Sequence, residues 1–349
     1  MLLTAGDIFS PQSQSTDFIL TLCGRLTHIS SSYSYRLADN YLPDTSCIQL
    51  ASVIRNNWSL KRLDLSGNCL YGPHFSDLME ALSSPACRIE TLQLGYNELP
   101  DTSCIQLASV IRNNPSLKIL DLSYNCLSGP HFSDLMEALS SPACRIETLC
   151  LVGNNLPDTS CIQLASVIRN NPSLKILDLS GNSLSGPHFS DLMKTLSSPT
   201  CRIEELLLAD NDLPDTSCIQ LASEIRNNPS LKILDLSGNS LSGPHFSDLM
   251  EALSSPACRI ETLKLGDNGL PDTSCIQLAS VIRNNPSLKI LVLYNNRLSG
   301  PHFSDLMEAL SSPACRIEEL RLSCIGLSED EEKEAIRKLE KQKPNMKII

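Results

Sequence analysis

The sequence of 349 residues is poor in aromatic side chains, which make up 4% of it and include a single tryptophan, Trp58. A large aromatic cofactor pocket is therefore not expected. Basic residues are also in deficit, with 28 Lys and Arg against 39 Asp and Glu and a formal net charge of −11. Because nucleic acids and anionic membranes attract basic surfaces, we expect neither as a partner.

Several motifs with a defined chemistry are missing. There is no apolar run of about 18 residues, so no transmembrane helix is expected. Residues 1–14 lack the charged and apolar regions of a secretory signal. No Cys-x-x-Cys pair occurs among the 15 cysteines, and no G-x-x-x-x-G-K-[ST] loop is present. We therefore predict no metal, no cofactor and no nucleotide-binding module in this chain.

What the sequence does contain is internal repetition. The segment Leu-Pro-Asp-Thr-Ser-Cys recurs every 57 residues, beginning at Leu42, Leu99, Leu156, Leu213 and Leu270. The segment Gly-Pro-His-Phe-Ser-Asp-Leu-Met recurs with the same step, beginning at Gly72. Five near-identical repeats therefore fill residues 42–326.

Each repeat consists of two half-repeats with the pattern L-x-x-L-x-L-x-x-N-x-L, as in residues 117–127 and 146–156. The alternation around Leu120 and Leu122 predicts a short strand with one buried face. The Asn that follows the strand is expected to bond backbone groups that the turn leaves unpaired. Ten half-repeats carry this residue: Asn40, Asn68, Asn97, Asn125, Asn154, Asn182, Asn211, Asn239, Asn268 and Asn296.

Helices are predicted between the strands. Cys104 and Leu107 in one half-repeat, and Phe132 and Leu135 in the other, stand at helical spacing, and residues 100–103 offer helix caps. Strands about 4.8 Å apart and helices about 10 Å wide cannot stack without curvature. We therefore predict an α/β leucine-rich-repeat solenoid, a horseshoe of twelve strands with a parallel β-sheet on the concave face and helices on the convex face.

The two ends of the chain depart from the repeat. Residues 1–15 are expected to be disordered, and residues 16–41 look like a degraded half-repeat that caps the N-terminal end. Residues 327–349 are predicted to form a C-terminal capping helix and a final strand. Ser328 and Glu331 have the spacing of a capping box at the start of that helix.

The half-repeats of alternating 28 and 29 residues resemble the ribonuclease-inhibitor class of leucine-rich repeats. So does Ser-Pro-Ala-Cys-Arg-Ile-Glu-Thr-Leu before every second strand, at Ser84–Leu92 and Ser141–Leu149. The same class forms the sensor region of NACHT-type immune receptors, the NLR family. The resemblance covers about residues 16–349 and implies a reduced, cytoplasmic protein that binds other macromolecules. This chain departs from ribonuclease inhibitor, which is expected to bind its partner through Trp, Tyr and acidic contacts across the strands. Here the lone Trp58 lies in a helix-to-strand turn, where the other repeats have Pro.

A comparison of the five repeats with one another separates a constant scaffold from a varied face. Five of 38 positions vary in the helix-bearing windows 42–60 and 72–90, but twelve of 19 vary in residues 61–71 and 91–98. Most of the varied positions alternate with the buried leucines. Drift at exposed positions is the alternative explanation, although exposed helix positions such as Gln49 are the same in every repeat. We predict that the concave face is the binding site.

The candidate partner-binding residues are the outward side chains of the strands and of the loops after them. They are Arg62, Asp64, Gln93, Tyr96, Asp121, Tyr124, Cys150, Asp178, Glu205, Leu207, Asp210, Asp235, Lys264, Asp267, Tyr294, Arg297, Glu319 and Arg321. Four aspartates from Asp64 to Asp235 form an acidic row that breaks at Val292, and the last repeats become basic. This row predicts a protein ligand with a basic patch. A solvated strand face without a partner would show the same row.

Two recurring groups look like catalytic chemistry. Pro-His-Phe-Ser-Asp contains the residue types of a Ser-His-Asp triad, but it occurs five times, and adjacent residues at a helix start point in different directions. We therefore predict that the protein is not an enzyme. The cysteines follow the repeat and are predicted to be buried, free thiols. Cys150 is the exception, since its place in the strand is outward.

Three functions remain open from the sequence. The first is protein recognition through the concave face, as the sensor region of an NLR-like innate-immune receptor. The second is a stand-alone inhibitor that occludes a basic enzyme, similar to ribonuclease inhibitor. The third is a passive scaffold, for which substitutions on the concave face would change nothing. The near-identity of the repeats fits recent tandem duplication or an engineered consensus, and the irregular ends favour a natural origin.

Overall fold

The computed structural model describes residues 34–226, 228 and 230–349. The predicted disordered segment 1–15 and most of the predicted cap at 16–41 lie outside these residues. In the described chain, short strands alternate with helices, and twelve strands follow one another in chain order within one parallel sheet. The predicted α/β leucine-rich-repeat solenoid is confirmed.

The strands are β1 (Ser34–Arg36), β2 (Arg62–Asp64), β3 (Thr91–Gln93), β4 (Ile119–Asp121), β5 (Thr148–Cys150), β6 (Ile176–Asp178), β7 (Glu205–Leu207), β8 (Ile233–Asp235), β9 (Thr262–Lys264), β10 (Ile290–Val292), β11 (Glu319–Arg321) and β12 (Lys347–Ile348). The helices are α2 (Ser46–Asn56), α3 (Phe75–Leu82), α4 (Ser103–Asn113), α5 (Phe132–Leu139), α6 (Ser160–Asn170), α7 (Phe189–Met193), α8 (Ser217–Ile225), α9 (Phe246–Leu253), α10 (Ser274–Asn284), α11 (Phe303–Ser311) and α12 (Glu329–Gln342).

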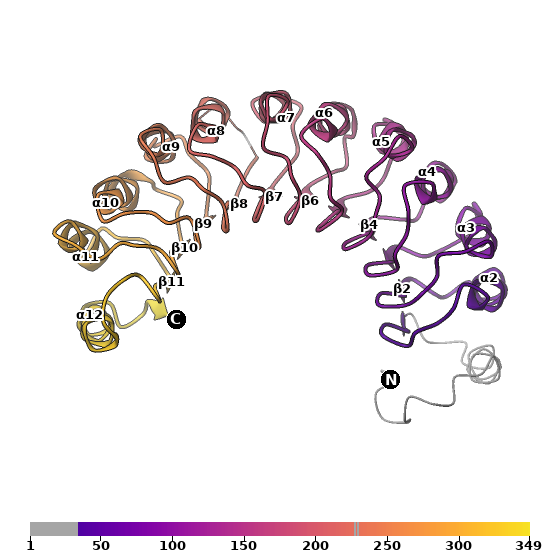
Figure 1. Ribbon diagram of the computed structural model, residues 1–349, viewed down its shortest axis with the longest axis horizontal. Coiled ribbons are helices and arrows are strands. Elements are labelled where there is room, and N and C mark those ends of the chain that lie inside the picture. Colours follow the sequence, from indigo (N-terminus) through magenta and orange to yellow (C-terminus); the bar gives the residue numbers. More distant parts are fainter. Residues whose placement is uncertain (1–33, 227, 229) are drawn as a thin grey trace. The chain divides into compact units, whose positions relative to one another are not determined.

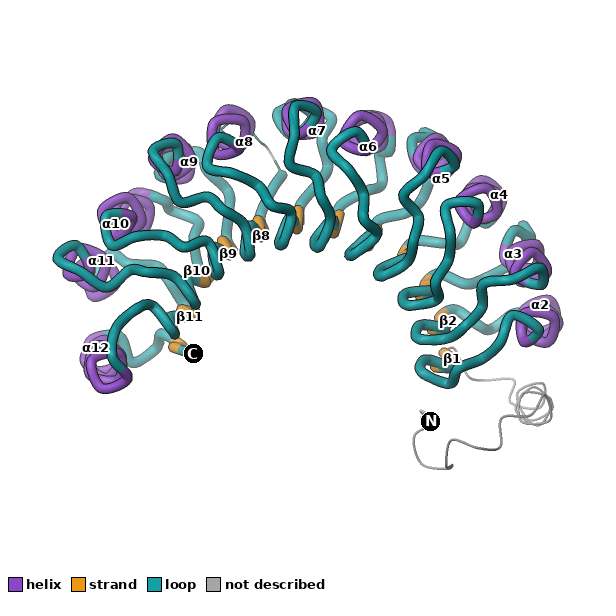
Figure 2. The backbone as a smooth tube through the Cα atoms, viewed as in Figure 1, coloured by secondary structure: helices purple, strands orange, loops and turns teal. Residues whose placement is uncertain are grey.

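The described chain divides into two compact parts. The N-terminal part comprises residues 34–156 and 170–177, and the C-terminal part comprises residues 157–169 and 178–349. Within each part the helices lie along one side and the strands along the other, joined by the loops of each coil (Figures 1 and 2). Each strand is too short to bury a core alone, so the core is the layer between the strands and the helices.

The asparagine after each strand ties its coil to the preceding one. Asn68 is buried, and its Nδ2 donates to the carbonyl oxygens of Leu37 (2.9 Å) and Leu65 (2.8 Å). Its Oδ1 accepts from the backbone N–H of Leu42 at 2.9 Å and of Asn40 at 3.3 Å. One side chain thus satisfies backbone groups in two coils, as the sequence pattern predicts.

The helix starts differ from the prediction. Thr102 precedes α4 but makes no side-chain cap hydrogen bond. The carboxylate of Asp101 instead reaches the next half-repeat, where its Oδ2 accepts from the backbone N–H of His131 at 3.3 Å. A Cβ atom at Gly129 would collide with this carboxylate, so the glycine makes room for it. The capping box of Ser328 and Glu331 at α12 is confirmed.

The third repeat contains an irregular helix. Helix α7 has five residues, whereas its counterparts α3, α5 and α9 each have eight. Thr195 stands where the other repeats have Ala, and its hydroxyl donates to the carbonyl oxygen of Leu192 at 2.6 Å. The same carbonyl accepts the backbone N–H of Thr195 at 3.1 Å, a bond to the third preceding residue. The threonine therefore stabilises a tight turn in place of a further turn of α-helix.

The cysteine thiols of the described chain are free, and most are buried in the core. Burial, followed by the nearby carboxylates of Asp101 and Asp134, raises the pKa of Cys104 to about 12. The same position in the other repeats has the same pKa of about 12, in Cys47, Cys161, Cys218 and Cys275. These residues act as small apolar side chains, and the prediction of buried free thiols is confirmed for them.

We expect native alkylation to separate two classes of cysteine. Because the thiolate is the nucleophile, iodoacetamide at pH 8 should label the exposed Cys69, Cys126 and Cys324 and leave Cys104 unlabelled. Peptide mass spectrometry with and without denaturant measures both classes in one sample. Native labelling of Cys104 at the rate of Cys126 would contradict the burial of Cys104 in the core.

Candidate protein-binding surface

The side of the strands that faces away from the helices, here called the exposed sheet face, carries the predicted binding residues. Along β2, Arg62 is exposed, Leu63 is buried and Asp64 is half-buried, as the alternation predicts. In the N-terminal part the strand positions are Arg62, Asp64, Gln93, Asp121 and Cys150, and the turn positions are Tyr96 and Tyr124. In the C-terminal part the strand positions are Asp178, Glu205, Leu207, Asp235, Lys264, Glu319 and Arg321, and the turn positions are Asp210, Asp267, Tyr294 and Arg297.

The aspartates of the N-terminal part are held by their own turns. Asp64 Oδ1 accepts the backbone N–H of Ser66 at 3.1 Å, and Asp121 Oδ1 accepts the backbone N–H (3.0 Å) and hydroxyl (2.6 Å) of Ser123. Neither carboxylate forms an ion pair within the described residues, although Arg36 is the register neighbour of Asp64. Both therefore present negative charge beside Gln93, which lies between them in the sheet.

Two tyrosines stand at the turns that follow this acidic row. Tyr96 and Tyr124 are stacked with ring centroids 4.2 Å apart and planes 14° from parallel, and they are 58% and 47% exposed. Both have positive φ angles of 53° and 54°. A Cβ atom at Gly153 would lie 2.6 Å from the Tyr124 ring, so the small glycine provides the space for it. An exposed aromatic pair is thereby fixed beside the carboxylates.

The exposed sheet face of the C-terminal part departs from the expected acidic row at Asp235. This residue is only 9% exposed, and its Oδ2 pairs with Lys264 Nζ at 3.0 Å across β8 and β9. The Tyr294 ring lies over Gly266, where a Cβ atom would approach it to 2.6 Å, and so adds bulk next to this pair. Asp235 is therefore a paired, covered carboxylate rather than a free recognition group.

Two further basic side chains of the C-terminal part are paired, whereas several of its carboxylates lie close to one another. Glu319 pairs with both Arg321 and Lys347 at 3.0 Å. Burial, followed by the carboxylates of Asp267 and Asp235, raises the pKa of Asp210. Among the described residues, Arg297 forms no ion pair and is exposed. The basic end predicted from the sequence is thus largely neutralised by its own carboxylates.

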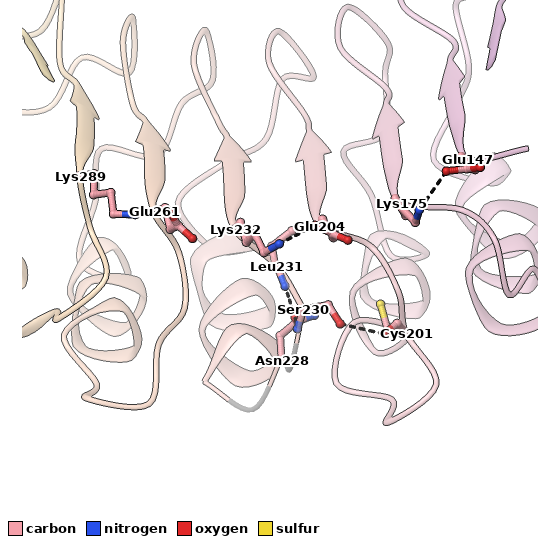
Figure 3. Close-up of polar contacts among 10 residues, drawn as sticks. All are labelled: Glu147, Lys175, Cys201, Glu204, Asn228, Ser230, Leu231, Lys232, Glu261 and Lys289. Atoms are coloured by element: carbon pink, nitrogen blue, oxygen red, sulfur yellow. Dashed lines mark hydrogen bonds and ion pairs between the residues drawn. The ribbon is translucent and has the colours of Figure 1, made fainter. Parts of the chain in front are cut away.

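At the opposite ends of the strands, a row of ion pairs joins successive coils. Lys232 Nζ lies 2.6 Å from Glu204, and Lys289 Nζ lies 2.6 Å from Glu261 (Figure 3). The hydrogen bond to Glu204 raises the pKa of Lys232. These pairs are exposed and contribute little stability each. They leave this edge of the sheet balanced in charge, in contrast to the edge that carries the tyrosines.

The side-chain amide of Asn228 fixes the loop that leads into β8. Asn228 Oδ1 accepts the backbone N–H groups of Ser230 (2.8 Å) and Leu231 (2.6 Å). The Ser230 hydroxyl donates to the carbonyl oxygen of Cys201 at 3.1 Å (Figure 3). The scaffold before β8 is therefore bound to the preceding coil by polar contacts independent of the exposed sheet face.

The repeated Ser, His and Asp do not form a triad in the described residues. His131 Nδ1 lies 3.2 Å from Asp134 Oδ2, but the Ser133 hydroxyl donates to the carbonyl oxygen of Pro130 at 2.8 Å. The hydroxyl is thus bonded to the backbone and not to the imidazole. No cluster of three metal-ligating side chains occurs in the described residues, and none of their helices is long and apolar enough to cross a membrane.

Comparison with known proteins agrees with this architecture. Two profiles described as Leucine Rich repeat match, one at residues 113–130 and the other at residues 59–81, 173–194 and 230–251. Ribonuclease inhibitor of Mus musculus is 34% identical over 308 residues, which cover 88% of this chain and 67% of that protein. The chain belongs to the ribonuclease-inhibitor family of leucine-rich-repeat proteins.

This leucine-rich-repeat chain is also similar to parts of larger proteins. NACHT, LRR and PYD domains-containing protein 3 of Bos taurus is 34% identical over 324 residues, covering 93% of this chain and 31% of that protein. NACHT, LRR and PYD domains-containing protein 12 of Homo sapiens is 34% identical over 308 residues, which cover 88% of this chain and 29% of that protein. A solved internalin of Listeria monocytogenes gives a TM-score of 0.48 at 18% identity, over 96% of this chain and 97% of that one.

Two residues of this leucine-rich-repeat surface were missed by the sequence analysis. Asp39 occupies the same repeat position as Tyr96, with a φ of 58°, and its carboxylate lies over Gly67. Asp101 and its equivalents bind the next half-repeat. Alignment of every half-repeat on its Asn would have revealed Asp39, whereas the Asp101 contact depends on the spatial approach of two loops.

Proposed function

We propose that this chain is a non-enzymatic protein-recognition module that binds a partner with a basic patch through the exposed sheet face of its N-terminal part. The observation that supports the proposal is the stacked tyrosine pair that lies beside the carboxylates of Asp64 and Asp121 in the N-terminal part. Asp64 and Asp121 carry unpaired charge beside exposed tyrosines, whereas Asp235 is paired with Lys264. Aromatic groups among charges are typical of protein interfaces.

The chain is proposed to act in the cytoplasm, where it forms the sensor region of an NLR-like innate-immune protein. The similarity to the NACHT, LRR and PYD domains-containing proteins supports this assignment, as do the free thiols of the described cysteines. A protein ligand is proposed in preference to a nucleic acid or a membrane because the lysines beside the sheet are paired with glutamates and the net charge is −11.

Charge reversal on the exposed sheet face tests the proposal. We expect the double variant Asp64→Lys/Asp121→Lys to lose at least tenfold in affinity for basic partner proteins enriched from source-tissue lysate, measured by quantitative mass spectrometry. The control, Glu80→Lys/Glu137→Lys, changes the charge by the same amount in the same repeats but at exposed helix positions. Equal loss in both variants, or no loss in the first, would overturn the assignment of the binding face.

A second candidate function is supported by the 34% identity to mouse ribonuclease inhibitor. In that case the chain would occlude the active site of a basic ribonuclease. Titration of a purified basic secretory ribonuclease with this chain, followed by an assay of RNA cleavage, distinguishes the two functions. Stoichiometric inhibition supports the inhibitor function. Full ribonuclease activity in the presence of micromolar concentrations of this chain excludes that function for the enzyme tested.

A further inference from the structure

The turn residue before each conserved Asn lies in the left-handed region, and its side chain leans toward the following half-repeat. In the N-terminal part the carboxylate of Asp39 lies over Gly67, and the ring of Tyr124 lies over Gly153. Tyr96 follows the same rule, because it stacks on Tyr124 in the next half-repeat. One face of the Tyr96 ring is therefore covered by Tyr124, and the other is directed toward Gly67.

The position between Asp39 and Tyr96 is occupied by Gly67, which has no side chain. The structure thus places a carboxylate and an aromatic face on the two sides of a glycine, at the exposed edge of three successive coils. Asp39 forms no side-chain hydrogen bond or ion pair within the described residues, and Tyr96 is 58% exposed. The Asp39 carboxylate itself fills the space above Gly67, so a ligand that reaches both groups lies between this carboxylate and the Tyr96 ring.

The chemistry of these two groups selects a planar cation. A guanidinium stacks on an aromatic ring and donates two parallel hydrogen bonds to a carboxylate, whereas an ammonium has neither the plane nor the fork. Gly95, the residue before Tyr96, also lacks a side chain, and a Cβ atom there would lie 3.9 Å from Asp121 Oδ1. A second carboxylate, from the following half-repeat, therefore lies close to the backbone next to Tyr96.

We propose that the Asp39 carboxylate, which covers Gly67, and the Tyr96 ring form a binding slot between them for an arginine side chain of the protein partner. Tyr96 provides the stacking face, Tyr124 holds Tyr96 in place, and Asp39 accepts the guanidinium hydrogen bonds. Asp64 and Asp121 attract the basic segment that carries this arginine. The inference rests on the proposed recognition function and specifies the side chain that the surface selects.

A pair of short peptides tests the slot without knowledge of the partner. The probes are N-acetyl-Gly-Arg-Gly-amide and N-acetyl-Gly-Lys-Gly-amide, titrated against the full chain labelled with 3-fluorotyrosine and followed by 19F NMR. We expect the arginine peptide to shift the Tyr96 and Tyr124 resonances and to bind about three- to fivefold more tightly than the lysine peptide. Equal affinity of the two peptides would overturn the proposal.

Three variants assign the preference to the slot. Tyr96→Asn should abolish the preference for arginine, and it is compatible with the positive φ because Asn295 occupies the equivalent position with a φ of 53°. Asp39→Asn should weaken the arginine peptide severalfold. Tyr71→Ala, an exposed tyrosine of the same part, is the control and should change neither affinity. A preference that survives Tyr96→Asn would contradict the slot.

The outcome for the slot is separable from the outcome for the proposed function. If Asp64→Lys/Asp121→Lys abolishes partner capture but the peptides bind equally, the recognition face stands and the arginine slot is wrong. If the peptide preference is present but partner capture is unaffected by charge reversal, the slot binds arginine and the assignment of the partner to this face is wrong.

Discussion

Replacement of Asn125 by Ala is expected to lower the free energy of unfolding by about 3 kcal/mol or more, because several buried backbone groups lose their partners together. Asn125 Nδ2 donates to the carbonyl oxygens of Leu94 (3.0 Å) and Leu122 (2.9 Å). Its Oδ1 accepts the backbone N–H groups of Asn97 (3.1 Å) and Leu99 (3.0 Å). The site is buried, so water cannot replace the amide without a change in the packing.

The measurement for Asn125→Ala is urea denaturation combined with amide hydrogen exchange. Because a repeat protein can open locally, exchange is expected to rise first in the turns at residues 94–99 and 122–127. The control is Asn113→Ala, at an exposed residue whose Nδ2 donates to Ser109 within its own helix. A loss of stability equal to that of the control would show that the inter-coil bonds do not hold the solenoid together.

Substitution of Val110 by Glu is expected to destabilise the fold by about 3 kcal/mol or more, because it places a carboxylate at a buried site. Val110 is 1% exposed in α4, and three counterparts, Val53, Val167 and Val281, are similarly buried. The fourth repeat has Glu224 at this position, where it is half-buried and its Oε1 accepts the Ser223 hydroxyl at 3.2 Å. Its helix α8 has nine residues instead of eleven.

Glu224, which stands where the other four repeats have valine, allows the opposite substitution to be tested. Glu224→Val, which copies the other four repeats, is expected to stabilise the chain by about 1–2 kcal/mol and to slow amide exchange in α8. Denaturation and exchange of both variants are compared with those of the unchanged chain. Destabilisation by Glu224→Val, or tolerance of Val110→Glu without loss of stability, would contradict the packing argument.

The elements that could be predicted from the sequence are those determined by a repeated local pattern. The alternation of Leu120 and Leu122 with outward residues gave the strands, and the Asn after each strand gave the bonds between coils. The capping box at Ser328 was also visible, because both partners lie within one helical turn. Each of these features depends on residues that are near one another in sequence or that recur at a fixed step.

The features that could not be predicted depend on side-chain direction between coils. Asp235 and Lys264 occupy equivalent strand positions, but the cover beside them comes from Tyr294, which leans over Gly266. The short α7 follows from the hydroxyl of Thr195, which donates to the carbonyl oxygen of Leu192. The helix propensity of threonine alone does not indicate this hydrogen bond. The sequence therefore indicated which positions of the row carry aspartate. It did not show that the charge of Asp235 is paired with Lys264.

The bonds of the conserved asparagines have a consequence for how such a chain changes its length over generations. Asn125 reaches acceptors and donors that lie 26 to 31 residues earlier, and Asn239, two repeats later, reaches the equivalent groups at the same separations. Unequal recombination between near-identical gene segments adds or removes whole 57-residue copies, and each new junction restores the same donors and acceptors. The number of repeats is therefore free to vary in steps of one repeat, because every added copy carries its own asparagines together with the backbone groups that they bind.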